Sequence, residues 1–216
     1  MVASIDGATA VDGASGGLGG AADHAVFPAI RGVPDMIVAA AGTVRAEGYG
    51  APKPSDRIRA MRRDRGQALV PRLAVVTRSI GLDLSSSLFA EAELPPLVIT
   101  TETADPARLD AVRAAGGEIV AAGTVEVDLA AVFGMLRRSG TGIVLVEGGP
   151  SLNGQLVAAD LIDEVCITVA PKLVGGDAAR LAHGGPAVVS SFELAHVLEL
   201  EGELCCRYVR ALPVDE

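Results

Sequence analysis

The chain has 216 residues, of which 50% are hydrophobic and 21% charged, and its formal net charge is -9. This composition can bury the core of one large domain or two small ones and gives no sign of disorder. The acidic balance argues against nucleic acid as a partner, because binding to a phosphate backbone needs a concentrated positive surface. The longest apolar runs are far shorter than the roughly 20 residues of a membrane helix, and no signal leader is evident, so we expect a cytoplasmic protein.

Three cysteines provide no CxxC pair, and Cys205 and Cys206 are adjacent on an expected strand, where their side chains point to opposite faces. The pattern offers no disulfide framework and fits a reducing compartment. One stretch departs from the acidic balance, since residues 53–72 hold seven basic residues against two acidic ones. It reads either as a solvated helical linker or as a basic island beside a site for a negatively charged small molecule.

Short β-rich apolar runs alternate with helical stretches, a rhythm typical of a mainly parallel sheet covered by helices. Towards the C-terminus, "FELAHVLELEGELCCRYVRAL" reads as two strands joined near Glu201–Gly202. The sequence therefore predicts an α/β fold, with a mainly parallel central sheet, flanking helices and a C-terminal antiparallel hairpin, in a single domain over residues 1–216. The expected strands are Met1–Ile5, Met36–Ala40, Leu73–Thr77, Leu97–Thr101, Glu118–Ala121, Ile143–Val146 and Val165–Ala170. The expected helices are Ala22–Arg31, Pro106–Ala115, Leu129–Arg138 and Ser151–Ala158.

The first strand reads as the body of a strand already under way, which leaves residues upstream of Met1 an open alternative. The stretch "SGGLGGAA" that follows contains G-x-G-x-x-A at Gly17, Gly19 and Ala22. A dinucleotide fingerprint should follow the first strand directly, with an acidic residue about 20 positions later. About ten residues intervene here and the second strand ends without a carboxylate, so a standard Rossmann fold is disfavoured. The glycines fit either a loop that closes over a ligand or a plain flexible loop.

Polar residues follow the second strand in "AAAGTVRAEGYG", residues 39–50. Gly42 and Thr43 could bind a phosphate at a helix start, or Thr43 could simply cap the helix. Arg45 and Glu47 lie just beyond the end of the strand, where open α/β sheets collect their ligands.

Polar residues or glycines that could bind a phosphate also follow two other expected strands. In "VVTRS", the hydroxyls of Thr77 and Ser79 with the guanidinium of Arg78 form either a cradle for a phosphate monoester or a surface turn. In "VEGGPSLNGQL", residues 146–156, a glycine turn leads from an apolar strand into a helix. Glycines allow a sharp turn and a close approach, and the N–H groups of a helix start suit an anion, so we expect a phosphate there.

Several chemistries are disfavoured by what the sequence lacks. The three histidines, His24, His183 and His196, are far apart, and no cysteine cluster gives metal-ligand spacing, so no metal is expected. No G-x-S-x-G elbow, P-loop or zinc-deaminase signature is present. Glycine turns, hydroxyls, arginines and carboxylates without a nucleophile suit chemistry carried by a bound cofactor, chiefly hydride transfer.

Taken together, "MVASIDG", "SGGLGG", "AGTVRAEGYG" and "VEGGPSLNGQL…LIDEVCITVAPKLVGG" resemble the reductase domain of the RibD-type pyrimidine reductases of riboflavin biosynthesis. The resemblance covers nearly the whole chain and is greatest to stand-alone actinobacterial-type members, which lack the deaminase half. It implies a dihydrofolate-reductase-like fold, a homodimer, and NADPH-dependent reduction of 5-amino-6-(5-phosphoribosylamino)uracil to its ribityl form.

The resemblance also implies a role for particular residues. Those implied to bind NADPH are Gly17, Leu18, Thr43, Thr77, Arg78, Ser79, Gly148, Gly149, Pro150, Ser151 and Leu152, with Thr77 to Ser79 on the 2′-phosphate. Those implied to lie on the substrate side are Ser15, Arg31 and Glu147.

Two departures from the family pattern bear on the substrate. Glu47 stands where bacterial pathway enzymes usually have Asp, and Lys53 or Arg57 would replace the usual phosphate-anchoring arginine. We expect Glu47 to orient the substrate or relay a proton during hydride transfer to C1′, and Arg31 with Lys53 or Arg57 to neutralise the phosphate. Two alternatives stay open: an NADPH-dependent reductase of a pterin such as dihydrofolate, and a non-catalytic NADPH-binding dimer.

Overall fold

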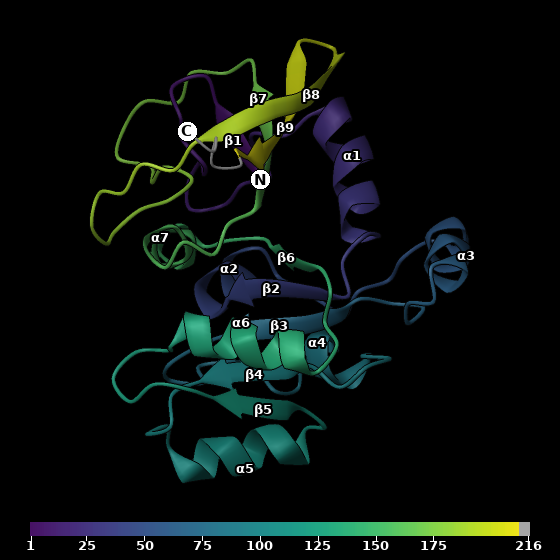
Figure 1. Ribbon diagram of the computed structural model, residues 1–216, viewed down its shortest axis with the longest axis vertical. Helices are drawn as coiled ribbons and strands as arrows, with labels where there is room; N and C mark the ends of the chain where they lie inside the picture. Colours follow the sequence, from purple (N-terminus) through teal and green to yellow (C-terminus); the bar gives the residue numbers. More distant parts are fainter. Residues whose placement is uncertain (212–216) are drawn as a thin grey trace, which may run out of the picture. The chain divides into compact units, whose positions relative to one another are not determined.

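The computed structural model describes residues 1–211, and the chain divides into two compact units (Figure 1). The central unit is Pro28–Gly148. The terminal unit combines Met1–Phe27 with the described residues from Gly149 onward. None of the described helices is long and apolar enough to cross a membrane.

The central unit is built on a five-stranded parallel sheet with the strand order β5-β4-β3-β2-β6. Each strand is short and strongly apolar, as is usual where helices cover both faces of a parallel sheet. Figure 1 shows β2 to β5 following one another in this order, with α5 beyond the edge strand β5. The strands are β2 (Met36–Ala40), β3 (Arg72–Val76), β4 (Leu97–Thr100), β5 (Glu118–Ala121) and β6 (Val144–Val146).

Three of the helices of the central unit begin at a residue whose side chain caps them. Asp105 and Asp128 each accept a hydrogen bond from a first-turn N–H, of Ala107 and Ala131, and so cap α5 and α6, and Ser55 caps α3. Helix α2 packs against β2 and β3. The helices are α2 (Ala41–Ala46), α3 (Asp56–Asp64), α4 (Ser87–Ala90), α5 (Pro106–Ala114) and α6 (Leu129–Arg138).

The core of the central unit joins the sheet to α2, α4 and α5 through buried side chains that include Ile37, Val75, Val98 and Phe89. Arg62 of α3 is also fully buried, and its guanidinium donates hydrogen bonds to the carbonyls of Gly32, Pro34 and Ala68. The segment around α3 is therefore helical, but it is more than a solvated linker, because one of its arginines holds two loops together.

The terminal unit contains a four-stranded sheet with the order β1-β7-β9-β8, in which only β1 and β7 are parallel. The C-terminal hairpin is confirmed, and its two-residue turn is Glu201–Gly202, both with positive φ, of 53° and 81°. The elements are β1 (Val2–Ser4), α7 (Pro150–Ala158), β7 (Glu164–Ala170), β8 (Phe192–Leu200) and β9 (Glu203–Arg210). Helix α1 (Ala21–Arg31) contains the division between the units, which falls between Phe27 and Pro28.

The expected strands all form within one or two residues of their predicted bounds, as do the four expected helices. The helix start expected at Gly42–Thr43 is confirmed as α2, but its N-cap is Ala40, so Thr43 lies in the first turn and does not cap the helix. Helix α4 was not expected. The parallel strands fall into two sheets, and the hairpin pairs with β7 in the terminal unit.

Candidate functional site

The carboxyl ends of three neighbouring strands gather most of the predicted residues of the central unit. Strand β2 lies between β3 and β6, and the parallel register pairs Ala40 with Val76 and Val38 with Val146. The carboxyl ends of all three strands therefore lie on the same side of the sheet, which is where open α/β sheets bind their ligands. The predicted residues at this edge are Thr43 after β2, Thr77, Arg78 and Ser79 after β3, and Glu147 and Gly148 after β6.

Glu147 is a buried carboxylate at the end of β6, with 2% of its side chain exposed. Arg31 meets it with two hydrogen bonds, from Nε to Oε1 at 2.6 Å and from Nη2 to Oε2 at 2.5 Å. The hydroxyl of Tyr49 donates a third, to Oε2 at 2.7 Å, and the Arg31 guanidinium carbon lies 5.2 Å from the centre of the Tyr49 ring. The carboxylate charge is thus neutralised and held by two side chains from distant parts of the sequence.

This cluster shifts the pKa of both partners of Glu147 upward. Burial, followed by the charge of Glu147 and the hydrogen bond to it, raises the pKa of the Tyr49 phenol, so the phenol stays a neutral donor. For Arg31, burial acts to lower the pKa, but the hydrogen bonds and charge of Glu147 outweigh it, and the net shift is upward. The Arg31–Glu147 pair is therefore a stable ion pair and not a source of mobile protons.

Thr77 is 6% exposed and anchors the turn that follows β3. Its backbone N–H donates to the Ile99 carbonyl at 2.9 Å, and its hydroxyl oxygen accepts from the N–H of Ile80 at 3.0 Å. Ile80 has φ of 50°, a region that β-branched residues rarely adopt, so this turn is strained. Such strain is concentrated at functional sites. Arg78 and Ser79 are exposed on the turn, as a phosphate cradle requires.

Thr43 and Glu47 lie on α2, the short helix that follows β2. Thr43 is half-buried in its first turn, and its carbonyl accepts from the N–H of Glu47, the C-cap residue. The Glu47 side chain is exposed beyond the last turn. The two residues are therefore four positions, or about one helical turn, apart.

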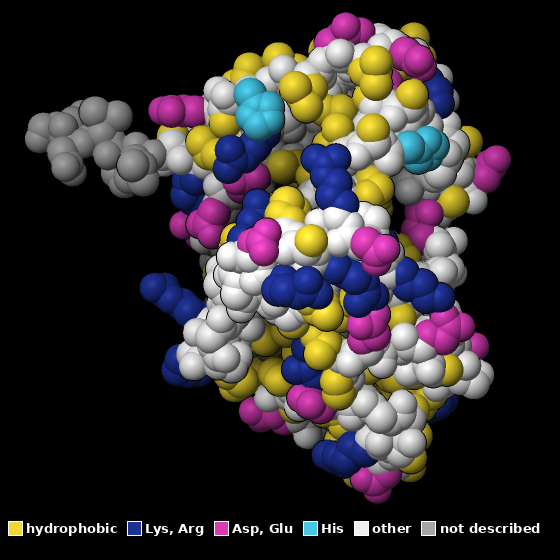
Figure 2. Space-filling model, turned by 90° about the vertical axis from the view of Figure 1, so that its right-hand side faces the viewer, with side chains coloured by type: hydrophobic (Ala, Val, Ile, Leu, Met, Phe, Trp, Pro, Cys, Tyr) yellow, Lys and Arg dark blue, Asp and Glu magenta, His cyan; other side chains and the backbone are white. Residues whose placement is uncertain are grey.

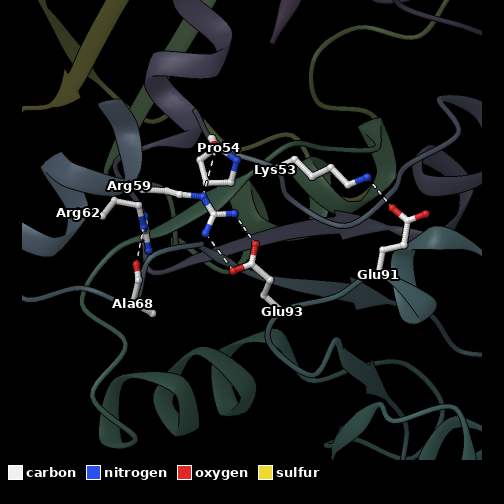
Figure 3. Close-up of polar contacts among 7 residues, drawn as sticks. All are labelled: Lys53, Pro54, Arg59, Arg62, Ala68, Glu91 and Glu93. Carbon is white, nitrogen blue, oxygen red and sulfur yellow. Dashed lines mark hydrogen bonds and ion pairs between the residues drawn. The ribbon is translucent and has the colours of Figure 1, made fainter. Parts of the chain in front are cut away.

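The two predicted phosphate anchors of the basic stretch differ in their surroundings. Lys53 forms an exposed ion pair with Glu91, with Nζ 2.5 Å from Oε2 (Figure 3). Arg57 is exposed on the first turn of α3. Arg59 is paired with Glu93. Figure 2 shows Lys and Arg side chains, with Asp and Glu beside them, over the side on which Figure 1 draws α3. Acidic partners thus offset part of the predicted basic island.

The three glycines of "VEGGPSLNGQL" meet three different structural requirements. In the central unit, Gly148 has φ of 94°, which side chains rarely allow, and its carbonyl accepts from the N–H of Ala40 at 2.8 Å. In the terminal unit, Gly149 is the N-cap of α7 and Pro150 its first residue. Gly154 is a packing position, because a Cβ there would lie 2.3 Å from the His183 carbonyl oxygen.

The first turn of α7 presents backbone N–H groups of Ser151 and Leu152, which have no acceptor within the helix. Ser151 is exposed, whereas the Leu152 side chain is 4% exposed and belongs to the core. Only the backbone of Leu152 is therefore suited to the predicted contact with a phosphate.

The predicted loop residues Ser15, Gly17 and Leu18 all belong to the terminal unit. Ser15 is half-buried, and its carbonyl accepts from the N–H of Leu18 at 2.9 Å. Gly17 is exposed, and a Cβ built on it would meet only Val11 at ordinary contact distance. Leu18 is fully buried against Val2 and Ala170, so its side chain is part of the core.

Sequence reasoning missed Tyr49, which completes the hydrogen bonds of Glu147. The two residues are 98 positions apart, and no spacing rule connects them. The tyrosine does stand in "EGYG", two residues after Glu47 and within the stretch of residues 39–50 that follows the second strand, and this was the available signal.

The protein has an α/β fold, and its polar residues gather at the carboxyl ends of parallel strands, where open α/β sheets generally bind ligands. Comparison with known proteins identifies the family. The model of the RibD C-terminal domain matches residues 1–206, and the chain belongs to this family.

Individual relatives agree with the family assignment. A protein of Aquifex aeolicus named 2,5-diamino-6-ribosylamino-4(3H)-pyrimidinone 5′-phosphate reductase is 28% identical over 168 residues, 78% of this chain and 70% of that protein. A protein of the same name from Methanothermobacter thermautotrophicus is 35% identical over 109 residues, about half of each chain. The crystal structure of a pyrimidine reductase-like protein from Corynebacterium diphtheriae superposes with a TM-score of 0.89 at 28% identity, covering 98% of this chain and 90% of that one. The predicted RibD-type, dihydrofolate-reductase-like fold is confirmed.

Proposed function

We propose that this chain is a reductase of riboflavin biosynthesis that converts the ribosyl group of a 5′-phosphorylated ribosylaminopyrimidine to ribityl. The observation that carries the proposal is the match to the RibD C-terminal domain over residues 1–206, together with relatives named as reductases of such a pyrimidine. The protein would then be an oxidoreductase acting as a single domain over residues 1–216.

We propose NADPH as the cofactor. When bound, it would supply the hydride that reduces C1′ of the ring-opened imine form of the substrate. The donor set at the end of β3 supports this choice, because an exposed guanidinium and hydroxyl at Arg78 and Ser79 suit the 2′-phosphate that distinguishes NADPH from NADH. In the terminal unit, the first-turn N–H groups of α7 suit a pyrophosphate.

The residues of the central unit support a division of roles for the substrate. Because Glu147 neutralises Arg31, the pair would orient neutral groups of the substrate more than bind its phosphate. Lys53 or Arg57 would meet the phosphate, and Ser15 of the terminal unit would contact the substrate as the family resemblance implies. Glu47 would orient the reacting sugar or relay a proton.

The proposal is tested by steady-state NADPH oxidation with three substrates: 5-amino-6-(5-phosphoribosylamino)uracil, its 2,5-diaminopyrimidinone counterpart, and dihydrofolate. We expect turnover with at least one phosphoribosylaminopyrimidine and none with dihydrofolate. Turnover with dihydrofolate alone would make the protein a pterin reductase, and tight NADPH binding without turnover would make it a non-catalytic module.

The role of Glu47 is tested by Glu47→Gln, which keeps the size of the side chain and removes its charge. We expect kcat to fall about 100-fold, the lower end of what acid–base and orienting groups contribute, with NADPH affinity nearly unchanged. Asp64→Asn, an exposed substitution at the end of α3, is the matched control. Loss of NADPH binding in Glu47→Gln would contradict the assignment.

We also propose a homodimer located in the cytoplasm. The edge strand β8 supports the dimer, because Leu194, Val197, Leu198 and Leu200 are each 47–54% exposed and an uncovered apolar edge invites pairing. Three free cysteines support a reducing compartment. Light scattering after gel filtration tests the dimer, and Leu198→Glu should shift the mass to that of one chain if β8 lies in the interface.

A further inference from the structure

The glycine-rich loop of the terminal unit, residues 15–20, is held by two charged side chains to which the family resemblance gives no role. Lys172 follows the end of β7, and its Nζ donates to the carbonyls of Gly17 and Leu18, both at 2.8 Å. Glu203 is the first residue of β9. Strands β7 and β9 are antiparallel neighbours, with Val169 near the end of β7 opposite Leu204 near the start of β9. Lys172 and Glu203 therefore lie at the same end of these two strands.

Glu203 acts on the other end of the loop, where α1 begins. Its carboxylate accepts hydrogen bonds from the N–H groups of Gly20 at 2.7 Å, Ala22 at 2.9 Å and Asp23 at 3.3 Å. These are groups that a helix start leaves without an acceptor within the helix. Glu203 is only 4% exposed, so its negative charge lies at the positive end of the helix and is shielded from water.

The glycines at positions 19 and 20 leave room for two carboxylates, those of Asp23 and Glu203. A Cβ built on Gly20 would lie 2.9 Å from Oε2 of Glu203, and one built on Gly19 would lie 2.6 Å from Oδ2 of Asp23. Asp23 is itself held by the hydroxyl of Thr168 at 2.7 Å. The loop therefore resembles a phosphate-binding turn in sequence, but an internal carboxylate already takes the place of the phosphate.

We propose that Lys172 and Glu203 are positioning residues that together fix the loop between β1 and α1, so that Gly17 and Leu18 are presented to the cofactor in one conformation. The cation binds carbonyl oxygens on one side of the loop, and the anion binds amide hydrogens on the other. One consequence is that the start of α1 cannot accept a phosphate of NADPH, because Glu203 occupies it. The effect on the cofactor rests on the proposed function, whereas the fixing of the loop does not.

The loop itself is tested by amide hydrogen exchange, read by mass spectrometry over residues 15–23 in the full chain. Lys172→Met and Glu203→Ala should each raise the exchange rate of this segment about tenfold, the value of one charge-assisted hydrogen bond, with β2 to β4 unchanged. Arg137→Met and Glu102→Ala, both exposed positions in the central unit, are the matched controls. Unchanged exchange in both test variants would overturn the proposal. If Glu203→Ala fails to fold, Glu203→Gln, which keeps the volume, replaces it.

The occupied helix start gives a second readout that general destabilisation would not produce. In Glu203→Ala, added formate or inorganic phosphate should enter the vacated position and raise the melting temperature more than in the wild type. Equal effects of these anions on variant and wild type would show that the helix start is not an anion position and would overturn the role of Glu203.

The link to the cofactor is tested by NADPH titration, with binding followed by its fluorescence. Lys172→Met should weaken NADPH binding about tenfold, and Lys172→Arg, which keeps the donors, should restore most of the affinity. Faster exchange with unchanged NADPH affinity would overturn the positioning role while leaving the proposed function intact. Failure of the wild type to bind NADPH would overturn the proposed function, and the exchange result would still decide whether the loop is fixed.

Discussion

Two buried carboxylates, one in each unit, are satisfied in opposite ways. Glu147 is bound by side chains, the guanidinium of Arg31 and the hydroxyl of Tyr49. Glu203 is bound by backbone N–H groups at the start of α1. Side-chain partners can turn towards a ligand at the cost of a rotamer change, whereas backbone partners cannot move without unfolding the helix start. The difference agrees with the proposal that Glu147 serves substrate recognition, whereas Glu203 determines the shape of a loop.

The largest effect is expected for Glu147→Ala. Removing the carboxylate leaves Arg31 without its main partner, and because 34% of the Arg31 side chain is exposed, water offsets part of the loss. We expect the free energy of unfolding to fall by about 2 kcal/mol and kcat/KM for the pyrimidine to fall about 100-fold, through misplaced substrate. Urea unfolding followed by far-ultraviolet circular dichroism and steady-state kinetics measure the two. A loss of stability with unchanged kinetics would assign Glu147 to structure alone.

A matched pair of glycine substitutions separates shape from binding in the loop of the terminal unit. Gly20→Ala forces the Glu203 carboxylate away and should cost about 1 kcal/mol of stability, the value of a helix cap. Gly17→Ala meets only Val11 at 3.7 Å and should change stability by less than about 0.5 kcal/mol. Only the second should weaken NADPH binding without a matching loss of stability. If Gly17→Ala binds NADPH as the wild type does, Gly17 is not a cofactor contact.

A smaller effect is expected for Tyr49→Phe, which removes one hydrogen bond to Glu147. The free energy of unfolding should fall by about 1 kcal/mol near neutral pH. Because folding raises the pKa of Tyr49 above its usual 10, the stability it contributes is complete below pH 10 and is lost as the pH rises towards the folded value. The difference between wild type and Tyr49→Phe should therefore shrink above pH 10, as thermal unfolding across that range would show. A constant difference would place the phenol outside the cluster.

The smallest effect concerns Asp6 in the terminal unit, whose carboxylate accepts hydrogen bonds from the Ser4 hydroxyl and the N–H groups of Val174 and Gly175. The Ser4 hydrogen bond and then the two backbone bonds lower its pKa from 3.8 to about 2. The resulting stabilisation is present above pH 4 and is lost as the pH falls towards 2. Asp6→Asn should accordingly lower the melting temperature slightly at pH 5 and have no effect near pH 2. An effect that grows on acidification would contradict this contact.

Hydrophobic patterning predicted the strands and the hairpin because each is a short apolar run bounded by turn residues. It failed at α4, whose four residues are too few to show a helical period, and at Arg62, where a guanidinium that binds three carbonyls fills a core position. The family resemblance named Arg31 and Glu147 but not their pairing. Lys172 and Glu203 were missed because their partners are backbone groups, which leave no trace in side-chain patterns.

The central claim is that this chain reduces the ribosyl carbon of a phosphorylated ribosylaminopyrimidine with a hydride from NADPH. The most direct measurement uses NADPH with both hydrogens at C4 of the nicotinamide ring replaced by deuterium, with mass spectrometry and NMR of the product. The account predicts one deuterium at C1′ of the ribityl chain. A ribityl product without deuterium, or deuterium found only in tetrahydrofolate when dihydrofolate is supplied, would contradict it.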